Sequence, residues 1–476
     1  MWDVEYMKLS ILASKTGKPK TYPAEIFKAY DIRGVVETHL TPDIVEEIGK
    51  VLGTLTLEAK VKALVVGYDG RLSSPGLAKR LIAGILKSGC EVYDIGVVTT
   101  PMVYFANYEL KTYSGVMITG SHNPPEYNGL KMVIGGETLS GDKIKNIHQR
   151  LEKGEFKDGI TTAKYTMYDV ESAYIEKITT SVKLKRKMSI IIDCGNGVAG
   201  NIAPKLYRRM GAKVLGLYCD VDGNFPNHHP DPSQPENLQD LMAALENPGA
   251  EVGLAFDGDG DRLGVVAKNG NIIYPDRQMM LFVADILEKN PKSKIIYDVK
   301  SSRLLDKWIK DHGGTPIMCR TGHSFIKAKI RETKAVLAGE MSGHIFFNDR
   351  WFGVDDGVYA GARLLEILSQ VEDPSALLNA LPNAISTPEI NIQVGEGKQH
   401  KIMEKLQKAA KFPGCESIIT VDGLRVEYAD GFGLVRASNT TSVLVLRFEA
   451  ETETGLKRIQ EQFRKNLAKF VTKINF

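Results

Sequence analysis

"KALVVGYDGRLSSPGLAKRLIAGILKSGCEVYDIG", residues 62–96, contains the pattern that decides the fold. An apolar run leads to Asp69 and a polar turn, an amphipathic stretch follows, and a glycine precedes a second apolar run. This order predicts a strand, a helix and a second strand. Two strands that are joined by a helix lie parallel in one sheet, and helices cover the faces of that sheet.

The same pattern occurs twice more along the chain. It returns in "MSIIIDCGNGVAGNIAPKLYRRMGAKVLGLYCD" (188–220) and in "SKIIYDVKSSRLLDKWIKDHGGTPIMCRTG" (293–322), with Asp193 and Asp298 at the turns. This internal repetition indicates three copies of one α/β domain. From about residue 384 the pattern ends, and strand-like runs with a final amphipathic helix indicate a smaller α+β domain.

We therefore expect an α/β fold in which three related domains with mainly parallel, mixed sheets and a smaller C-terminal α+β domain surround a central cleft. The expected domains are residues 1–168, 169–271, 272–383 and 384–476.

Each of the three copies continues into a third apolar strand that ends in a polar loop. These strands and loops are "GVMITGSHNPP" (115–125), "VGLAFDGDGDR" (252–262) and "AVLAGEMSGH" (335–344). Ligands of open α/β sheets gather at the carboxyl ends of the strands, so we expect the three loops to line one shared cleft.

Composition and charge narrow the class of protein. The net charge of the 476 residues is +3, too small to indicate nucleic acid or membrane as a partner. No apolar run approaches the roughly 20 residues of a membrane span, and the N-terminal sequence does not resemble a secretory signal. Five scattered cysteines favour free thiols in a reducing compartment over a disulfide framework or a zinc site. We therefore expect a cytoplasmic protein, either a monomer or a small homo-oligomer.

Three aspartates follow the third strand of the second copy. Residues 257–261 read Asp-Gly-Asp-Gly-Asp, and Arg262 comes next. A hairpin turn needs only one Asp-Gly pair, whereas three carboxylates in five residues repel one another unless a cation lies between them. An EF-hand would need Gly at the position of Arg262, so we interpret the loop as a Mg²⁺ site built from hard oxygen ligands.

The equivalent loop of the first copy lies within "ITGSHNPPEYNG" (118–129) and presents Ser121 between glycines and prolines. Such residues make a rigid loop with unusual backbone angles, which is typical of a supported nucleophile. The sequence "TGSHN" is not a G-x-S-x-G elbow, and the chain contains no P-loop, so neither a serine hydrolase nor a P-loop phosphotransferase is indicated.

An alternative reading comes from "GNGVAG" (195–200), which has the dinucleotide-binding spacing after a strand and is followed by Asp220. It would indicate a nicotinamide- or flavin-dependent enzyme such as a dehydrogenase. The equivalent turns of the other two copies lack the fingerprint, so inheritance of a glycine-rich turn explains it more simply.

Two further loops carry groups that suit a sugar phosphate. "RASNTTS" (436–442) combines one guanidinium with several hydroxyls and an amide, which are donors that bind phosphate. In "GEMSGH" (339–344), Glu340 and Ser342 can hold vicinal sugar hydroxyls, and His344 lies near them in sequence.

"KAYDIRG" (28–34), "TGSHNPPEYNGLK" (119–131), "DGDGDR" (257–262), "GEMSGH" and "RASNTT" together resemble the α-D-phosphohexomutases, most closely the bacterial phosphomannomutase/phosphoglucomutase branch. The resemblance runs in order from about Phe27 to the C-terminus. It implies four domains and the interconversion of hexose 1-phosphate and hexose 6-phosphate, with mannose, glucose or both as the sugar. The reaction would pass through a phosphoserine and a hexose 1,6-bisphosphate, which also serves as activator, and Mg²⁺ would be held against the phosphoserine.

The resemblance also implies a role for individual residues. It implies catalytic roles for Ser121, Lys131, His344 and Arg33, substrate contacts for Arg262, Lys300, His323, Glu340, Ser342, Arg436, Ser438, Asn439 and Thr440, and metal ligation by Ser121, Asp257, Asp259 and Asp261.

Some questions stay open at the level of sequence. The phosphate loop of the family usually continues to a proline, and this chain has Ser442 there. Residues 1–26 look like an extension with no assigned role. A phosphoglucosamine mutase is the nearest alternative function, although that branch typically has Gly-Thr-Glu where this chain has Asn439-Thr440-Thr441.

Overall fold

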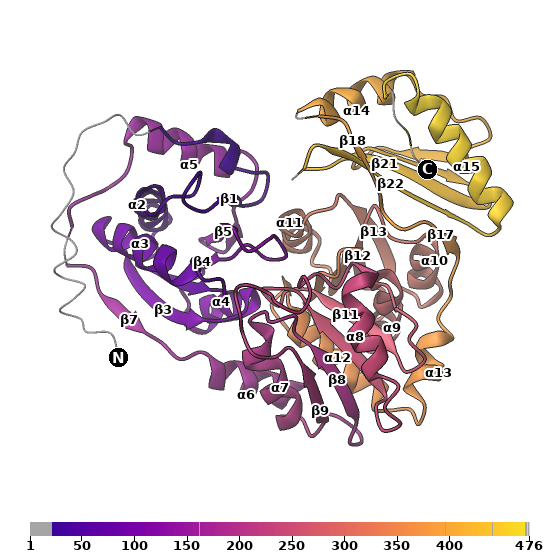
Figure 1. Ribbon diagram of the computed structural model, residues 1–476, viewed down its shortest axis with the longest axis horizontal. Helices are drawn as coiled ribbons and strands as arrows, with labels where there is room; N and C mark the ends of the chain where they lie inside the picture. The colour runs from indigo at the N-terminus through magenta and orange to yellow at the C-terminus, as the bar shows by residue number, and fades with distance from the viewer. Residues whose placement is uncertain (1–20, 161, 396, 440, 472–473, 475) are drawn as a thin grey trace. The chain divides into compact units, whose positions relative to one another are not determined.

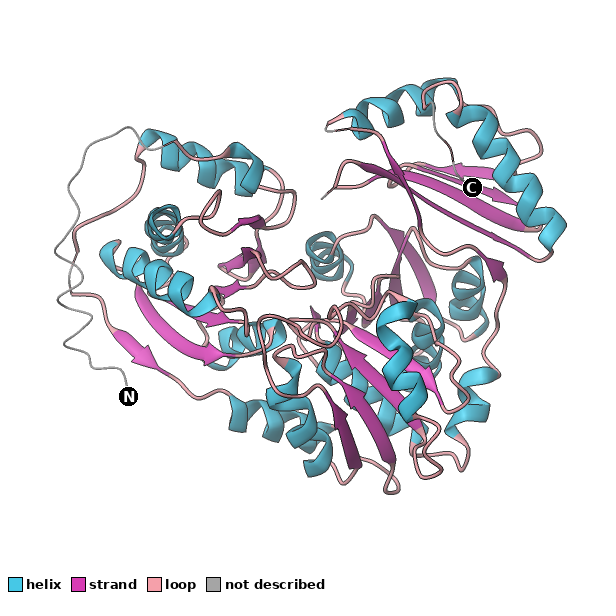
Figure 2. Cartoon of the chain, in the orientation of Figure 1, coloured by secondary structure: helices cyan, strands magenta, loops and turns pink. Residues whose placement is uncertain are grey.

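The computed structural model describes residues 21–160, 162–395, 397–439, 441–471, 474 and 476. The chain forms two compact units, one that ends at Val170 and one that begins at Glu171 (Figure 1). Helices flank the sheets in both units (Figure 2). Among the described residues, no helix combines the length and the apolar character that a membrane crossing requires.

The first unit is built on one mixed sheet with the strand order β1-β5-β4-β2-β3-β7, and β6 pairs with β5. β2 is parallel to β3 and to β4, β3 is parallel to β7, and β5 is antiparallel to its neighbours β1 and β4. The strands are β1 (Ile32–Val35), β2 (Ala63–Tyr68), β3 (Glu91–Val97), β4 (Gly115–Ile118), β5 (Tyr127–Ile134), β6 (Glu137–Thr138) and β7 (Tyr165–Met167).

The second unit contains three sheets. Their strand orders are β11-β10-β8-β9, β13-β12-β14-β15-β16 and β17-β22-β21-β20-β19, and β18 pairs with β22. The strands of the first two sheets are β8 (Ser189–Asp193), β9 (Lys213–Leu217), β10 (Val252–Phe256), β11 (Leu263–Ala267), β12 (Lys294–Asp298), β13 (Thr315–Cys319), β14 (Leu337–Gly339), β15 (Ile345–Phe347) and β16 (Val354–Asp355).

The predicted threefold repeat is confirmed by the order and direction of the strands. In each copy the first strand (β2, β8 or β12) pairs in parallel with the second on one side and with the third on the other. The third strand then pairs antiparallel with a fourth, namely β5, β11 or β15. The three sheets therefore share one topology, as expected if one domain was copied.

The C-terminal sheet, made of antiparallel pairs, confirms the predicted α+β domain. Its strands are β17 (Ile385–Ser386), β18 (Ile390–Gln393), β19 (Ser417–Ile419), β20 (Leu424–Tyr428), β21 (Gly431–Ala437) and β22 (Val443–Ala450). The amphipathic helix α15 (Glu453–Leu467) packs on this sheet through Ile459 and Phe463, which are fully buried.

The helices of the first unit are η2 (Ala24–Ile26), α2 (Pro42–Glu58), α3 (Ser74–Lys87), α4 (Thr100–Glu109) and α5 (Asp142–Lys153). Those of the second unit, besides α15, are α6 (Glu171–Ser181), α7 (Ala199–Arg209), η3 (Pro235–Leu238), α8 (Gln239–Ala244), α9 (Pro275–Lys289), α10 (Arg303–Asp311), α11 (His323–Thr333), α12 (Gly357–Leu368), α13 (Pro374–Asn379) and α14 (Lys398–Ala409). Several begin at a capping side chain: Thr41 accepts a hydrogen bond from the amide of Ile44, and Asp356 accepts one from Tyr359.

The expectation that residues 1–26 form an extension is wrong for the part that the structure describes. Ile26 is 1% exposed and belongs to the hydrophobic core of the first unit, and the Tyr22 hydroxyl donates to Glu47. Burial of an isoleucine side chain stabilises a fold by roughly 1.5–3 kcal/mol, so this segment is part of the first domain. Residues 1–20 lie outside the described part of the chain.

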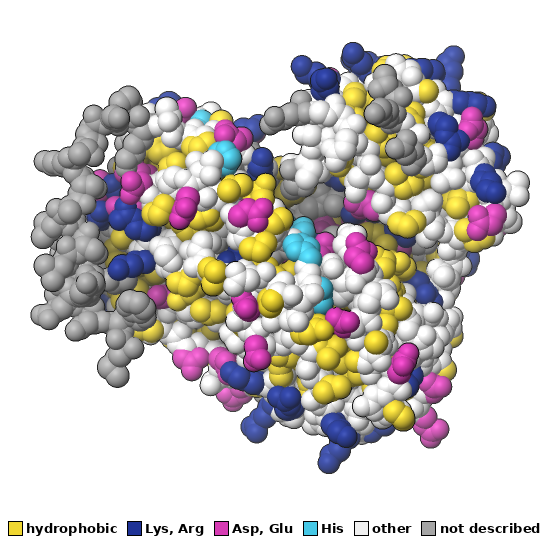
Figure 3. Space-filling view, in the orientation of Figure 1, with side chains coloured by type: hydrophobic (Ala, Val, Ile, Leu, Met, Phe, Trp, Pro, Cys, Tyr) yellow, Lys and Arg dark blue, Asp and Glu magenta, His cyan; other side chains and the backbone are white. Residues whose placement is uncertain are grey.

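Lys and Arg side chains are interspersed with Asp and Glu on the face drawn in Figure 3. This mixing agrees with the small net charge of +3.

Candidate active site

Three polar loops occupy the same position in the three repeated domains. Each connects the third strand of its sheet to the antiparallel fourth strand, so each starts at the carboxyl end of a parallel strand. The loop before β5 carries Ser121, the loop before β11 carries the three aspartates, and the loop before β15 carries Glu340 and Ser342. The topology therefore explains why the predicted site residues cluster in three short segments.

Ser121 has an unusual backbone conformation. Its φ is +51°, which non-glycine residues seldom adopt, and it is 1% exposed. Its amide donates to the Thr119 hydroxyl at 2.7 Å, and its own Oγ lies 3.2 Å from Nδ1 of His122. Backbone strain of this kind is concentrated at functional sites, because surrounding contacts must enforce it.

Many of the contacts that hold this backbone conformation come from Arg71. Its side chain is fully buried, and its guanidinium donates to four backbone carbonyl oxygens of the loop. The distance from Nη2 to the carbonyl of Ser121 is 2.8 Å. A Cβ atom at Gly120 would lie 2.4 Å from Cζ of Arg71, so the close approach requires a glycine. Arg71 is not among the residues predicted from the sequence, although its place directly after the turn of Asp69 could have suggested a bracing cation.

Two other predicted residues of the first unit lie on strands beside this loop. Arg33 of β1 donates from Nη1 to the Asn123 side chain at 2.6 Å and pairs with Asp31. Lys131 of β5 stands opposite Met117 in β4 and is 4% exposed. The first unit thus holds Arg33 against the Ser121 loop.

The three aspartates of the second copy are fully buried, and one carboxylate oxygen from each lies within 4.8 Å of the others. Asp257 also orders the loop, because its Oδ1 accepts the amides of Asp261 and Arg262 at 3.1 Å each. Burial lowers the pKa of Arg262, but the surrounding carboxylates outweigh it and raise the pKa above its usual value. Three hard oxygen ligands in this arrangement suit a divalent cation.

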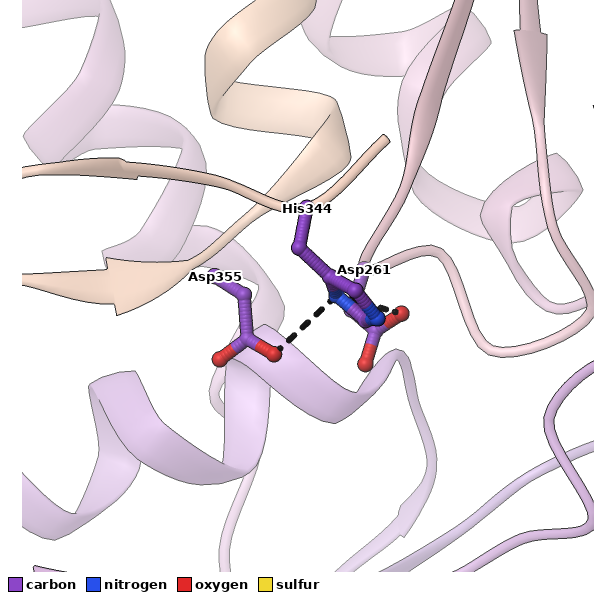
Figure 4. Close-up of side chains that lie close together, drawn as sticks. All are labelled: Asp261, His344 and Asp355. Atoms are coloured by element: carbon purple, nitrogen blue, oxygen red, sulfur yellow. Dashed lines mark ion pairs between the residues drawn. The ribbon is translucent and has the colours of Figure 1, made fainter. Parts of the chain in front are cut away.

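Arg262 and His344 join the aspartate loop to the Glu340 loop. The two residues form an isolated antiparallel bridge, and Nε of Arg262 donates to Nε2 of His344 at 3.1 Å. The other ring nitrogen, Nδ1, lies 3.2 Å from Asp355 and 3.5 Å from Asp261 (Figure 4). The structure therefore brings the predicted residues Asp261, Arg262 and His344 together.

Glu340 is buried beside the N-terminus of α11. It accepts the amide of Gly322 at 2.6 Å, and Ser342 donates to it at 3.2 Å. Burial raises the pKa of Glu340, and His344 and Lys300 oppose that effect. The predicted residue His323 begins α11, and its ring centroid lies 5.7 Å from that of His344. Glu340, Ser342, His323 and His344 thus form one group.

Lys300, a predicted substrate residue, and the described part of the predicted phosphate loop lie where the third and fourth domains meet. Lys300 pairs with Glu389 at 2.8 Å, and Arg436 pairs with Asp422 at 2.8 Å. Nδ2 of Asn439 is buried and has no hydrogen-bond partner among the described residues, so it can donate to a bound anion. Ser438 accepts from the Thr441 hydroxyl at 2.8 Å, and the predicted residue Thr440 lies outside the described residues.

The turn aspartates that first revealed the repeat also brace these loops. Asp69 accepts from the hydroxyl of Thr119 at 2.7 Å and from the amide of Gly120. Asp298 accepts from the amide of Met341 in the Glu340 loop at 3.1 Å. In both copies the end of the first strand is therefore tied to the functional loop beside it.

The glycine-rich turn "GNGVAG" has a similar supporting role. A Cβ atom at Gly197 would lie 2.9 Å from Cα of Gly258, and the amide of Val198 donates to the carbonyl of Gly258 at 3.2 Å. Gly258 separates the first two aspartates of the metal loop. Close packing against that loop explains the turn without a dinucleotide.

In the second copy the turn aspartate, Asp193, pairs with His228 at 3.0 Å instead. Burial lowers the pKa of His228, but its hydrogen bond to Asp193 and the charge of that carboxylate raise it by more, so the net shift is upward. The ion pair therefore stabilises the fold fully below about pH 6.5, the ordinary histidine value, and this stabilisation is lost as the pH rises through the higher folded-state pKa.

Replacement of His228 by glutamine should thus destabilise the protein by about 1 kcal/mol more at pH 5.5 than at pH 8.5. Thermal unfolding of wild type and His228→Gln at both pH values measures the difference. A stability gap that is equal at the two pH values, or larger at pH 8.5, would contradict the ion pair.

A buried serine in a strained loop and a buried carboxylate triplet, on copies of one α/β domain, are the features of a phosphoryl-transferring enzyme of the phosphohexomutase class. Family models bear this out domain by domain. The models of phosphoglucomutase/phosphomannomutase α/β/α domains I, II and III match residues 24–158, 172–270 and 274–385, and the model of the C-terminal domain matches 389–466.

Known proteins are similar over nearly the whole length. The chain is 57% identical to a phosphoglucomutase of Neisseria gonorrhoeae, over 92% of this chain and 96% of that protein. It is 52% identical to a phosphomannomutase/phosphoglucomutase of Pseudomonas aeruginosa, over 95% and 97%. A crystal structure of a phosphoglucomutase/phosphomannomutase family protein from Burkholderia thailandensis superimposes with a TM-score of 0.89 at 52% identity, over 94% of this chain and 97% of that one.

The chain belongs to the phosphoglucomutase/phosphomannomutase family of α-D-phosphohexomutases. It is accordingly an intramolecular phosphotransferase that acts on sugar phosphates, and the alternative of a nicotinamide-dependent dehydrogenase is set aside.

Proposed function

We propose that this enzyme interconverts the 1-phosphate and 6-phosphate of glucose and of mannose through a phosphoryl group carried on Ser121. The observation that carries the proposal is the strained, buried conformation of Ser121, which Arg71 and Thr119 hold in place. A fixed nucleophile meets the demand of in-line phosphoryl transfer, in which positioning contributes most of the rate.

In the first half-reaction the bond between phosphorus and Oγ of Ser121 breaks, and a bond forms between phosphorus and a free hydroxyl oxygen of the sugar phosphate. The proton of that hydroxyl passes to a base, for which Lys131 and His344 are the candidates, and Oγ of Ser121 takes up a proton as it leaves phosphorus. The product is a hexose 1,6-bisphosphate, which reorients in the site and then returns its other phosphoryl group to Ser121. Enzyme that has lost its phosphoryl group needs a bisphosphate to restore it, which accounts for the proposed activator.

Asp257, Asp259 and Asp261 are proposed to hold Mg²⁺. The donor set fits, because three buried carboxylates offer oxygens within 4.8 Å of one another. When bound, the cation neutralises charge on the transferring phosphoryl group. The protein contributes the loop order that Asp257 enforces through two backbone amides.

The remaining predicted residues are proposed to hold the substrate. Glu340 and Ser342 would bind two neighbouring sugar hydroxyls, and their mutual hydrogen bond keeps both on one side of the loop. The distal phosphate would meet a cationic group in which Nδ2 of Asn439 has no partner among the residues that the structure describes. The proposed contacts to the distal phosphate and to the transferring group are Arg33, Arg262, Lys300, His323, Arg436, Ser438, Asn439 and Thr440.

The five cysteines carry free thiols, which supports the proposal that the enzyme works in a reducing cytoplasm.

Glucose 1-phosphate and mannose 1-phosphate should be used with kcat/KM values within about 200-fold of each other. The two sugars differ only at carbon 2, and Glu340 and Ser342 are proposed to bind the 3- and 4-hydroxyls that both share. A modest contact difference is worth about 1–3 kcal/mol. The measurement is kcat/KM with Mg²⁺ and a trace of the matching 1,6-bisphosphate.

Glucosamine 1-phosphate is the control substrate and should be the poorest of the three. If it were the best substrate, the protein would have to be reassigned to the phosphoglucosamine branch. A preference above about 1000-fold for either neutral hexose, roughly 4 kcal/mol, would reveal a carbon-2 contact that the matched loops do not supply.

A further inference from the structure

Asp355, at the end of β16, is a buried carboxylate to which no role has been assigned. It is 0% exposed and accepts a hydrogen bond from Nζ of Lys327 at 2.9 Å. Its other oxygen lies 3.2 Å from Nδ1 of His344 and 3.6 Å from Nδ1 of His323. One carboxylate therefore lies beside both histidines of the proposed site, and its approach to His344 is drawn in Figure 4.

The two edges of the His344 ring are held by different partners. Because the Arg262 Nε–H donates to Nε2, that nitrogen is an acceptor, and a neutral ring must carry its proton on Nδ1. Nδ1 lies 3.2 Å from Asp355 and 3.5 Å from Asp261, so Asp355 is the nearer of two carboxylates beside a proton on this nitrogen. Burial alone would raise the pKa of Asp355, but Lys327 and the two histidines hold it well below its usual range, so the acceptor is a charged carboxylate.

We propose that Asp355 is a positioning residue that fixes the ring orientation and the Nδ1–H tautomer of His344 and orients His323 beside it. The proposal rests on the proposed function, because it assigns those two histidines to the reacting site. Asp355 acts through the rings, much as an outer carboxylate orients a histidine in other enzymes.

The neighbouring residue provides a matched control. Asp356 is buried to the same degree, but it caps α12 and accepts from Tyr174, Trp351 and the amide of Tyr359. Burial raises the pKa of Asp356 to about 7. Its contacts are structural, so Asp356→Asn should change thermal stability and leave turnover intact.

The test compares Asp355→Asn with Asp356→Asn in the full chain. We expect Asp355→Asn to lower kcat at least tenfold while Asp356→Asn keeps kcat within twofold of wild type. Because Asp355→Asn leaves the buried Lys327 without its carboxylate, which destabilises the fold, the double variant Asp355→Asn/Lys327→Met removes both members of the pair. It should recover thermal stability without recovering kcat.

Ring-nitrogen NMR of protein labelled with ¹⁵N-histidine reads the tautomer directly. The signal assigned to His344 should be that of an Nδ1–H tautomer, and it should move in the Asp355 variants but not in Asp356→Asn. Unchanged ring signals, or wild-type kcat in the double variant, would overturn the proposal. A wild-type chain without mutase activity would instead contradict the proposed function, and the NMR result would still decide the role of Asp355.

Cys194 and Cys219 form a pair of thiols that the proposed mechanism does not use. Cys194 follows β8, Cys219 follows the adjacent strand β9, and their sulfur atoms lie 3.6 Å apart. Cys194 is buried and Cys219 is partly exposed. The hydrogen bond between the thiols lowers the pKa of Cys219 despite its burial, and the same bond together with burial raises the pKa of Cys194. Because Cys219 is the partly exposed member of the pair, it is the nucleophile that an oxidant can reach, and Cys194 is the partner behind it.

We infer that Cys194 and Cys219 become joined by a reversible disulfide when the protein reacts with a small-molecule disulfide. The Cys219 thiolate attacks one sulfur of the oxidant, forms a mixed disulfide and releases one thiolate. Cys194 then loses its proton and attacks Sγ of Cys219, which releases the second thiolate. The oxidant is reduced to two thiols and the protein gains one disulfide, with the sulfurs closing from 3.6 Å to a bond length of about 2.05 Å.

Closure of this bond should affect the metal loop. The carbonyl of Cys194 accepts the amide of Gly197 at 2.7 Å, and Gly197 and Val198 pack directly on Gly258. A movement of Cys194 is thus passed to the segment between Asp257 and Asp259. The disulfide form should bind Mg²⁺ several times more weakly than the dithiol form.

The experiment treats the full chain with oxidised glutathione and measures intact mass, a peptide map and the Mg²⁺-induced rise in melting temperature. Wild type should lose two hydrogens with Cys194 linked to Cys219, and dithiothreitol should reverse this. Cys194→Ser should instead trap glutathione on Cys219, and Cys415→Ser, which removes a partly exposed thiol of the C-terminal domain, should behave as wild type. Stable glutathione adducts on wild-type Cys219, or an unchanged Mg²⁺ effect in the linked form, would overturn the inference.

Discussion

Ser121→Ala is expected to lower kcat by roughly 10⁴-fold or more, the scale seen when a covalent nucleophile is removed. Alanine has no oxygen to carry the phosphoryl group, so both half-reactions lose their acceptor. The fold should survive, because the contacts that hold the loop use the backbone of residue 121, whose carbonyl accepts from Arg71 and whose amide donates to Thr119. Turnover measured with glucose 1-phosphate and a trace of glucose 1,6-bisphosphate gives the result.

Intact mass provides a second measurement of the same prediction. Wild type incubated with the bisphosphate should gain one phosphoryl group that maps to Ser121, and Ser121→Ala should gain none. Ser88→Ala is a matched control, since Ser88 is equally buried and its hydroxyl donates to the carbonyl of Ile85 at the end of α3. That variant should lose about 1 kcal/mol of stability and keep its turnover. Near wild-type kcat in Ser121→Ala would remove the basis of the proposed mechanism.

The fold was predictable because its information is local and repeated. Each copy combines a β-branched run, a turn aspartate and an amphipathic helix within about 35 residues, and three copies make a chance pattern implausible. Sequence also predicts that a loop follows each third strand. Ligand groups concentrate at such strand ends in α/β sheets, so the candidate residues could be chosen from short segments.

The supporting residues could not be predicted in the same way. Arg71 reaches the Ser121 loop across 50 residues of chain, and Asp355 contacts α11 from a two-residue strand. Neither lies in a periodic pattern or in a loop with unusual composition. Their importance follows from long-range packing, in which a buried charge is tolerated only where several partners satisfy it. The core position of Ile26 was missed for the same reason, because a short segment before the first repeat has no periodicity to reveal its burial.

Asp259→Asn is expected to reduce Mg²⁺ affinity by roughly 100-fold, about 2.7 kcal/mol, and to lower turnover at limiting Mg²⁺ by a similar factor. The middle carboxylate of the triplet is fully buried, and one oxygen of each member lies within 4.8 Å of the others. Asparagine keeps the shape and one carbonyl oxygen but removes a negative charge. The cation therefore loses electrostatic attraction while the loop keeps its length and its backbone hydrogen bonds to Asp257.

The thermal stability of the metal-free protein should not fall in Asp259→Asn, although its Mg²⁺ affinity does. Three buried like charges repel one another, and these carboxylates raise the pKa of Arg262 beside them. Removal of one charge relieves the repulsion, so the metal-free melting temperature of Asp259→Asn should equal or exceed that of wild type.

Addition of Mg²⁺ should distinguish wild type from Asp259→Asn. A ligand at 100 times its dissociation constant stabilises the folded state by about 2.7 kcal/mol, so Mg²⁺ should raise the melting temperature of wild type clearly and that of Asp259→Asn very little. Asp231→Asn is the control: Asp231 lies 3.9 Å from Arg262 but is not a member of the triplet, so that variant should keep most of the Mg²⁺ effect. Full wild-type activity after exhaustive treatment with EDTA, or an equal Mg²⁺ effect in Asp259→Asn, would show that the triplet does not hold the catalytic cation.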